Sequence, residues 1–151
     1  MTCATIMRQN FEVVHEGETI CAAVEKMRHS NSAILPVIDA DGCLVGSLGI
    51  NDLFARLIPW VATTADLLPN LLFATDNLDE LQMNFEHLRN APLRRVMNRE
   101  PAKVYPEAPL VEAIRLFGRS RTMITVVERK SQKLIGVIFA EDTLRLIPAA
   151  L

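Results

Sequence analysis

The sequence predicts an α+β protein in which a β-α-β-β-α unit occurs twice, with a helical insertion between the two copies. Three observations lead to this prediction. The chain of 151 residues aligns with itself when it is shifted by 90 positions, which is the signature of an internal repeat. In each copy, a helical spacing of apolar residues is followed by two short strand-like runs. The stretch between the copies is apolar and contains neither glycine nor serine, so it is unlike a flexible linker.

The repeat rests on matched positions rather than on long identical runs. The pairs that lie 90 positions apart include Met7 and Met97, Val14 and Val104, Ile20 and Leu110, Ala23 and Ala113, Gly46 and Gly136, and Asp52 and Asp142. Near Pro36 the offset falls to 89, which indicates one small insertion. A shared order of elements explains this register better than chance does, so both copies are expected to fold alike.

Local signals define the elements of the first copy. Thr19 is a favourable helix N-cap, and the apolar residues from Ile20 to Met27 have the spacing of one helix face. Asp41-Gly42 is a hairpin turn signal between two apolar runs. The expected elements are an extended segment at 11–14, a helix from Ile20, strands at 34–38 and 44–50, and a final helix that starts near Asp52.

The second copy repeats this order with different residues. Pro109 suits the first turn of its helix, and the apolar residues from Leu110 to Phe117 repeat the helical spacing. The expected elements are an extended segment at 102–105, a helix from Leu110, strands at 124–127 and 134–139, and a final helix that starts near Asp142.

The expected division of the chain is a first unit at 1–58, an insertion at 59–92 and a second unit at 93–151. Within the insertion, Asp76 is expected to cap a helix that presents one apolar face. The residues of that face are Leu78, Leu81, Phe85 and Leu88. A further helix is expected at 60–73. Because the insertion is apolar, we expect it to pack on the units or at a subunit contact.

Composition and charge exclude several classes of protein. Half of the residues are hydrophobic and 23% are charged, which excludes a disordered chain. The net charge is −2 and there are one Trp and one Tyr, so no nucleic-acid partner is expected. The charge is uneven, because residues 1–88 carry 4 basic and 12 acidic side chains and residues 89–151 carry 12 and 6. This asymmetry is typical either of a half that binds anions or of two halves that attract each other.

Cysteine usage and hydropathy indicate a cytoplasmic protein. Cys3, Cys21 and Cys43 are too few and too scattered for a disulfide framework, and a reduced compartment is the simplest interpretation. The apolar stretch 57–74 is interrupted by two prolines and an aspartate, so direct membrane insertion is not expected. The histidines lack neighbours at metal-ligand spacing, and no nucleophile, acid–base or phosphate-loop motif occurs. We therefore expect no catalytic residue, no metal site, no cofactor and no enzyme.

One set of residues recurs in the same order in both copies. The set comprises Met7, Val14, Thr19-Ile20, Ala23, Met27, Leu35-Pro36-Val37-Ile38-Asp39, Gly42, Leu44, Gly46 and Asp52, and then Met97, Val104, Pro109-Leu110, Ala113, Phe117, Ile124, Val126-Val127-Glu128, Leu134, Gly136 and Asp142. This ordered pair resembles the CBS domain, named for cystathionine β-synthase, in its tandem form, the Bateman module. The resemblance implies two units packed by their sheets about a pseudo-twofold axis. It also implies adenosine-containing ligands in clefts between the units, and dimers of the module.

The resemblance further implies a ligand motif, Gly-apolar-x-Ser/Thr-x-x-Asp, at the turn from a strand into the final helix. The hydroxyl and the free N–H groups of the helix start face a phosphate, and the aspartate accepts hydrogen bonds from the ribose. Both copies keep the aspartate as Asp52 and Asp142, but Gly49 and Phe139 stand in the place of the hydroxyl residue. Gly49 still lets the backbone approach an anion, whereas Phe139 would crowd a phosphate. For both aspartates the alternative role is helix capping.

Several residues are therefore candidates for one adenosyl ligand per chain. Asp52 is the main candidate for the ribose, and Arg121 for the phosphates. The apolar candidates are expected to enclose the adenine, with simple core packing as the alternative. The complete set of candidate ligand-binding residues is Asp52, Gly49, Ile50, Val14, Ile34, Arg121, Asp142, Val104 and Ile124.

These observations favour a stand-alone regulatory protein that binds AMP, ADP, ATP or S-adenosylmethionine and modulates a partner enzyme or transporter. The alternative is a structural interaction module whose nucleotide sites have degenerated and which scaffolds a partner through its insertion. A homodimer is expected in either case, because the final helices are apolar and the family packs such helices against a second copy.

Overall fold

The computed structural model describes residues 1–57, 77–119 and 122–148. The first unit contains β1 (Val14–His15), α1 (Ile20–Ser30), β2 (Ile34–Ile38), β3 (Leu44–Gly49) and α2 (Ile50–Leu57). The second unit contains β4 (Lys103–Val104), α6 (Leu110–Phe117), β5 (Met123–Val127), β6 (Leu134–Phe139) and a 3₁₀ helix at Ala140–Leu146. Helix α5 (Asn77–Leu88) lies between them in sequence, and short 3₁₀ turns at Cys3–Thr5 and Leu93–Arg95 precede the two units. The predicted α+β fold with two similar units is confirmed.

The two sheets have the same topology. Each has three strands, in the orders β1-β2-β3 and β4-β5-β6. In each sheet the first pair is parallel and the second pair is antiparallel. The register shifts between Val37 and Ile38 in one sheet and between Val126 and Val127 in the other. The two irregularities are 89 positions apart, which matches the change of offset seen in the sequence.

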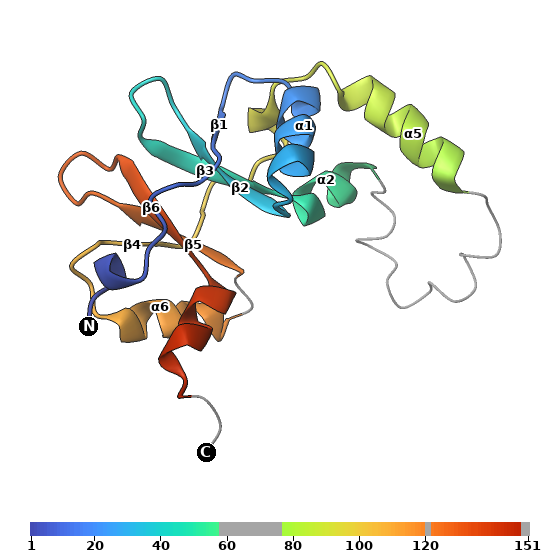
Figure 1. The fold of residues 1–151 in the computed structure, drawn as a ribbon. Coiled ribbons are helices and arrows are strands. Elements are labelled where there is room, and N and C mark those ends of the chain that lie inside the picture. The colour runs from blue at the N-terminus through green and yellow to red at the C-terminus, as the bar shows by residue number, and fades with distance from the viewer. Residues whose placement is uncertain (58–76, 120–121, 149–151) are drawn as a thin grey trace.

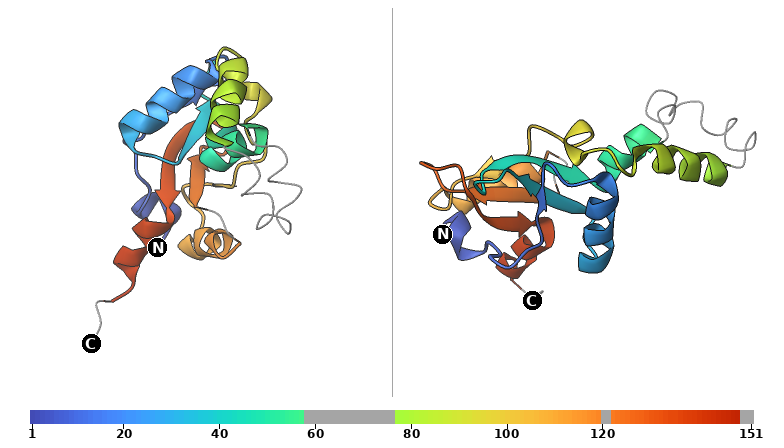
Figure 2. Two further views of the ribbon diagram at one scale, coloured as in Figure 1. Left: turned by 90° about the vertical axis from the view of Figure 1, so that its right-hand side faces the viewer. Right: turned by 90° about the horizontal axis from the view of Figure 1, so that it is seen from above.

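The strands of both units lie next to one another in the middle of the molecule, with α1 and α6 on the outside (Figures 1 and 2). Backbone hydrogen bonds join the two hairpins at their turns. The N–H of Leu44 donates to Gln132 O, and the N–H of Leu134 donates to Gly42 O, both at 3.1 Å. Leu44 and Leu134 are 90 positions apart, and so are Gly42 and Gln132. Each bond is therefore the counterpart of the other in the repeat, as a pseudo-twofold axis requires.

The turn and cap signals of the first unit are confirmed. Thr19 Oγ1 accepts a hydrogen bond from the N–H of Ala22 at 3.1 Å, which caps α1. Gly42 has a positive φ of 83° in the hairpin turn, a conformation that glycine adopts without steric cost. Asp39 Oδ1 accepts hydrogen bonds from the N–H groups of Asp41 and Cys43 and so closes this turn.

Each unit receives part of its core from the segment that precedes the other unit. Leu93 is fully buried in the core that contains Val14 and Ile20, and Cys3 is fully buried in the core that contains Val104. Backbone bonds fix both crossings: the N–H of Cys3 donates to Ala108 O, and the N–H of Leu93 donates to Glu18 O, each at 2.9 Å. Figure 1 shows the N-terminal turn beside α6 and β4 of the second unit. The two segments are therefore exchanged between the units.

The insertion contains the predicted helix as α5. Its Leu81, Phe85 and Leu88 pack against the core of the first unit, whereas Leu78 is 60% exposed and does not share their buried face. The expected cap Asp76 and the expected helix at 60–73 lie outside the described residues. None of the helices in the described ranges has the length and apolar content needed to cross a bilayer.

The two final helices differ. Helix α2 is an α-helix, whereas its counterpart at Ala140–Leu146 is a 3₁₀ helix, so the expectation of equal helices is corrected. Asn84 Nδ2 of α5 donates to Leu57 O at 2.7 Å, and this bond satisfies a terminal carbonyl of α2. The second unit has no such helix packed against its final turn among the described elements.

Candidate functional site

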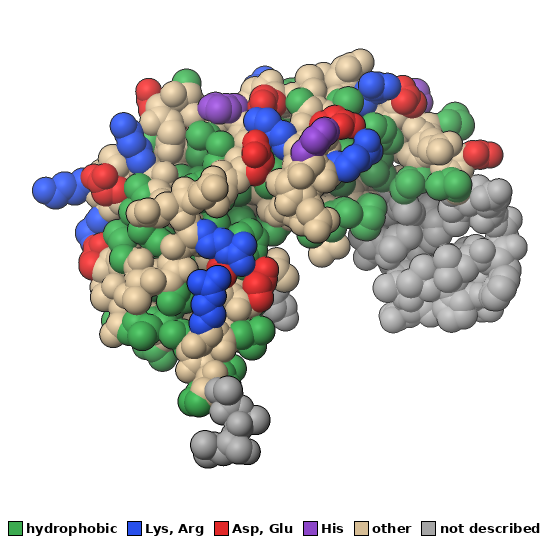
Figure 3. Space-filling model, viewed as in Figure 1, with side chains coloured by type: hydrophobic (Ala, Val, Ile, Leu, Met, Phe, Trp, Pro, Cys, Tyr) green, Lys and Arg blue, Asp and Glu red, His purple; other side chains and the backbone are tan. Residues whose placement is uncertain are grey.

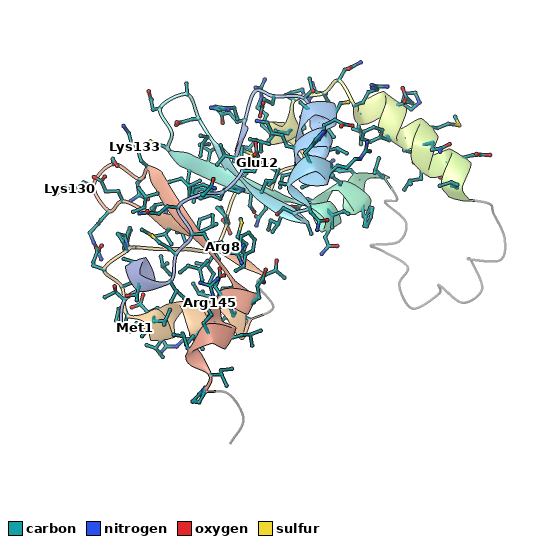
Figure 4. The ribbon with its side chains drawn as sticks, in the orientation of Figure 1. Met1, Arg8, Glu12, Lys130, Lys133 and Arg145 are labelled. Atoms are coloured by element: carbon teal, nitrogen blue, oxygen red, sulfur yellow. The ribbon has the colours of Figure 1, made fainter. Side chains whose placement is uncertain are left out.

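A cleft of about 720 Å³ lies between the two units. The first unit contributes the N-terminal segment, the loop into β2 and the turn from β3 into α2, and the second contributes the segment before β4 and the ends of β5 and β6. Arg8 and Glu12 lie on the N-terminal segment that runs between the units (Figure 4). Acidic and basic side chains lie side by side across the centre of the same view (Figure 3). The cleft is thus lined by polar and apolar side chains from both copies of the repeat.

Asp52 stands at the turn from β3 into α2, on the wall of this cleft. Helix α2 follows β3 without a loop, so the carboxylate reaches back over the turn. Its Oδ2 accepts a hydrogen bond from the N–H of Gly49 at 2.8 Å. Within the described part of the chain its Oδ1 has no hydrogen-bond donor. The capping role is therefore present, and it uses only one of the two carboxylate oxygens.

Ser47 is a second polar group in the cleft, which the sequence analysis did not single out. Alternate residues of a strand point to opposite faces, so Ser47 and Gly49 line the cleft while Leu48 is fully buried in the core. Ser47 is only 4% exposed, and its hydroxyl has no partner among the described residues. The sequence motif expected a hydroxyl at the position of Gly49, and the strand period of two could have pointed to the residue two positions earlier.

Asp142 is the counterpart of Asp52, but its carboxylate is already bound. Asp142 is 2% exposed, and its Oδ2 accepts a hydrogen bond from the N–H of Phe139 at 2.9 Å. Arg8 Nε donates to Oδ1 and Oδ2 at 2.9 and 3.0 Å, and Arg8 Nη2 donates to Oδ1 at 2.7 Å. The guanidinium also lies over the Phe139 ring, 4.8 Å from its centroid. The hydrogen bond to Asp142 raises the pKa of Arg8 above its ordinary value.

Asn98 occupies the position of Arg8 in the other half of the repeat, and it behaves differently. Both residues pair through their backbones with the last strand of the opposite unit, Arg8 with Val137 and Asn98 with Ser47. The side chain of Asn98 turns to its own segment, where Oδ1 accepts a hydrogen bond from the N–H of Glu100 at 3.0 Å. Asn98 therefore does not engage Asp52, and the two halves of the cleft are chemically unequal.

The other candidate residues fall into three groups. Ile34, Gly49 and Ile50 line the cleft with Asp52, although the N–H of Ile50 already donates to Ala33 O at 2.8 Å. The apolar residues at 0–5% exposure belong to the two cores instead of the cleft wall, namely Val14, Val104 and Ile124. Arg121 lies outside the described residues. In the described ranges no three His, Cys, Asp or Glu side chains gather as metal ligands would.

Solved structures with a similar fold include a CBS-pair protein. CBSX2 from Arabidopsis thaliana is 25% identical, with a TM-score of 0.75 over 96% of this chain and 92% of that one. The structure of CBSX2 in complex with AMP matches with a TM-score of 0.70 over 96% and 94% of the two chains. A CBS domain-containing protein from Bacillus anthracis has a TM-score of 0.77 at 15% identity, over 97% of this chain and 92% of that one, and this likeness concerns the fold alone.

A curated relative is homoserine O-acetyltransferase from Methanococcoides burtonii, with 27% identity over 145 residues. The match covers 95% of this chain and 24% of the relative, so the chain spans about a quarter of that protein. The family model for the CBS domain matches residues 3–59 and 93–149. These two matches coincide with the two β-α-β-β-α units and their preceding segments, and the chain therefore belongs to the CBS domain family, as a tandem pair.

Proposed function

We propose that this CBS pair is a regulatory protein that binds one adenosine-containing ligand per chain in the cleft, at Asp52. The observation that carries the proposal is the unequal state of the two aspartates: among the described residues no donor reaches Asp52 Oδ1, whereas both oxygens of Asp142 are bound by Arg8. The AMP complex of CBSX2, a protein 25% identical over most of both chains, supports the choice of ligand class.

The residues around Asp52 have complementary roles in this proposal. Asp52 Oδ1 accepts hydrogen bonds from the ribose hydroxyls. The hydroxyl of Ser47, which lines the cleft and has no partner among the described residues, forms a hydrogen bond with the ligand. Ile34 provides an apolar contact for the purine, and Gly49 leaves the turn open to a close approach. Arg121 remains the proposed contact for phosphate.

The proposed regulation depends on the fact that both units line the cleft. A ligand held by both units binds best to one relative arrangement of them, and it therefore shifts the population of arrangements. A partner that senses the same arrangement is coupled to the ligand by that free-energy difference. The proposed role is thus regulatory and not catalytic, and it takes place in the cytoplasm on a partner enzyme or transporter.

Isothermal titration calorimetry with AMP, ADP, ATP and S-adenosylmethionine tests the proposal. We expect a stoichiometry of one ligand per chain for at least one of them. Asp52→Ala and Asp52→Asn should both weaken binding by tenfold or more, because each removes the carboxylate. Asp52→Asn is the matched control for folding, since its amide oxygen can still accept the hydrogen bond from the Gly49 N–H. Asp142→Ala should leave this binding event in place.

A second candidate function is a ligand-free interaction module. It is favoured by the glycine at position 49, where the family motif has a hydroxyl, and by exposed apolar side chains around α2 and α5. Ile50, Phe54 and Met83 are 41%, 48% and 63% exposed. If none of the four compounds binds at millimolar concentration, this function replaces the first.

A further inference from the structure

Arg8 lines the cleft and makes a bidentate charged contact with Asp142. The guanidinium engages both carboxylate oxygens through three hydrogen bonds of 2.7–3.0 Å. Charge-assisted bidentate contacts of this kind are the stronger class of hydrogen bond. Their acceptor is 2% exposed, whereas the Arg8 side chain is 42% exposed. The Arg8 guanidinium is therefore accessible to a competing ligand, whereas the buried Asp142 carboxylate requires a hydrogen-bond donor.

We propose that Arg8 is an internal occupant of the second ligand position: its guanidinium takes the place on Asp142 that a ribose would take, and Arg8 thereby limits the chain to one ligand. This inference rests on the proposed function for the chemical class of the ligand, an adenosine-containing compound. It goes beyond that function because it assigns a role to Arg8 and predicts a second, latent site.

The pseudo-symmetry of the repeat identifies the position. Asp52 and Asp142 both accept the N–H three residues earlier, from Gly49 and Phe139. Both turns therefore hold their aspartate by the same local hydrogen bond. In the described ranges only the second aspartate has a donor from the opposite segment, because Arg8 stands where the other half has Asn98.

The backbone delivers Arg8 to this position. The N–H of Arg8 donates to Val137 O at 2.7 Å, and the N–H of Val137 donates to Arg8 O at 3.0 Å. The side chain is thus tethered next to Asp142 at a high effective concentration. Phe139 offers its ring face to the guanidinium, and this adds a cation–π contact. A ligand at this position would have to displace the Arg8 guanidinium from Asp142 and from the Phe139 ring. It would also have to supply hydrogen bonds to the Asp142 carboxylate, because a buried charge without a partner is costly.

Calorimetry with adenosine and with AMP tests the role of Arg8. Adenosine is included because we expect Phe139 to crowd a phosphate in the second position. The wild-type protein should bind one equivalent, and Arg8→Ala should bind two equivalents of adenosine. The double variant Arg8→Ala/Asp142→Ala should return to one. Arg28→Ala removes an arginine whose side chain is 71% exposed and should not change the wild-type count.

The outcomes separate this inference from the proposed function. If Arg8→Ala still binds one equivalent, or if its second event survives in the double variant, the inference is wrong and the proposed function stands. Two equivalents in the wild-type protein also overturn it. If the wild-type protein binds nothing and Arg8→Ala binds one equivalent that depends on Asp142, the inference holds and the proposed function fails. If neither protein binds a ligand, both the inference and the proposed function fail.

If Arg8→Ala does not fold, Arg8→Gln provides the same test, because glutamine keeps most of the side chain and lacks the charge and the bidentate guanidinium.

Discussion

Met7 and Gly136 touch across the boundary between the two units, and a Cβ atom on Gly136 would lie only 2.8 Å from Met7 Sδ. The same relationship occurs in the other half of the repeat, where a Cβ on Gly46 would lie 2.6 Å from the backbone oxygen of Asn98 and 3.0 Å from Met97 Sδ. Each glycine is therefore required because the segment of the opposite unit crosses directly over its strand. The two glycines allow the units to pack closely, and neither is among the residues that line the cleft.

Replacing Gly46 with alanine should destabilise the protein by about 1–3 kcal/mol, the usual cost of a side chain forced into a packed interior. The nearest atom is a backbone oxygen, which cannot move without breaking the pairing of Ser47 with Asn98. Urea unfolding at pH 7 measures the change. Gly17→Ala is the control, because nothing lies within 4 Å of a Cβ there. Equal stability of Gly46→Ala and Gly17→Ala would contradict the close approach.

The protein should be a homodimer in solution. Phe54 on α2 is 48% exposed beside Ile50 at 41%, and an exposed apolar patch commonly marks a protein contact. We expect a sedimentation mass of about twice the chain mass of 16.9 kDa. Phe54→Glu should shift the mass towards the monomer, whereas Arg115→Glu, at an exposed position of α6, should not. A wild-type mass near that of one chain at micromolar concentration would show that the helices do not form such a contact.

Glu18 should make the stability of the protein dependent on pH in the acid range. Burial raises the pKa of Glu18, but the hydrogen bonds from the His15 N–H and from Lys26, with the charge of Lys26, outweigh burial and leave the pKa below its ordinary value of 4.5. A carboxylate with a lowered pKa stabilises the folded state above the unfolded pKa, and this contribution is lost as the pH falls through the folded pKa. We expect Glu18→Gln to cost about 1 kcal/mol at pH 7.

Chemical unfolding of the wild type and Glu18→Gln from pH 7 to pH 3 measures this effect. The difference between the two proteins should be constant down to about pH 5 and should shrink below it, because the wild-type side chain is then protonated. A difference that stays the same at pH 3 would mean that the contacts of Glu18 contribute through packing and not through charge.

Asn84 should couple the insertion to the first unit. Its side-chain amide donates to the carbonyl of Leu57 at the end of α2, so Asn84→Ala leaves a terminal carbonyl without this partner. We expect a loss of about 1 kcal/mol in the free energy of unfolding, measured with urea. Met83→Ala, whose side chain is 63% exposed on the same helix, should change it little. A larger loss for Met83→Ala than for Asn84→Ala would place the stabilising contact on another face of α5.

The candidate site was only partly predictable from the sequence. The motif at the end of β3 led to Gly49, Ile50 and Asp52, which do line the cleft with Ile34. The apolar candidates Val14, Val104 and Ile124 lie in the two cores, because a pattern of apolar residues does not distinguish a core face from a ligand face. Ser47 was not found, since the motif places its hydroxyl two positions later on the same face of the strand.

The sequence by itself determined the repeat, the order of elements in both units, the caps and turns of the first unit and the apolar face of α1. The expected face of α6 is only partly buried, because Leu110 and Ala113 are buried but Ile114 is 47% exposed. These features depend on residues a few positions apart, whose spacing and chemistry dictate local backbone conformation. The tertiary structure alone decided that the two preceding segments exchange units and that Arg8 binds Asp142 across 134 positions. Such contacts depend on how the two units pack together, and no local periodicity shows which side chain of one unit reaches which group of the other.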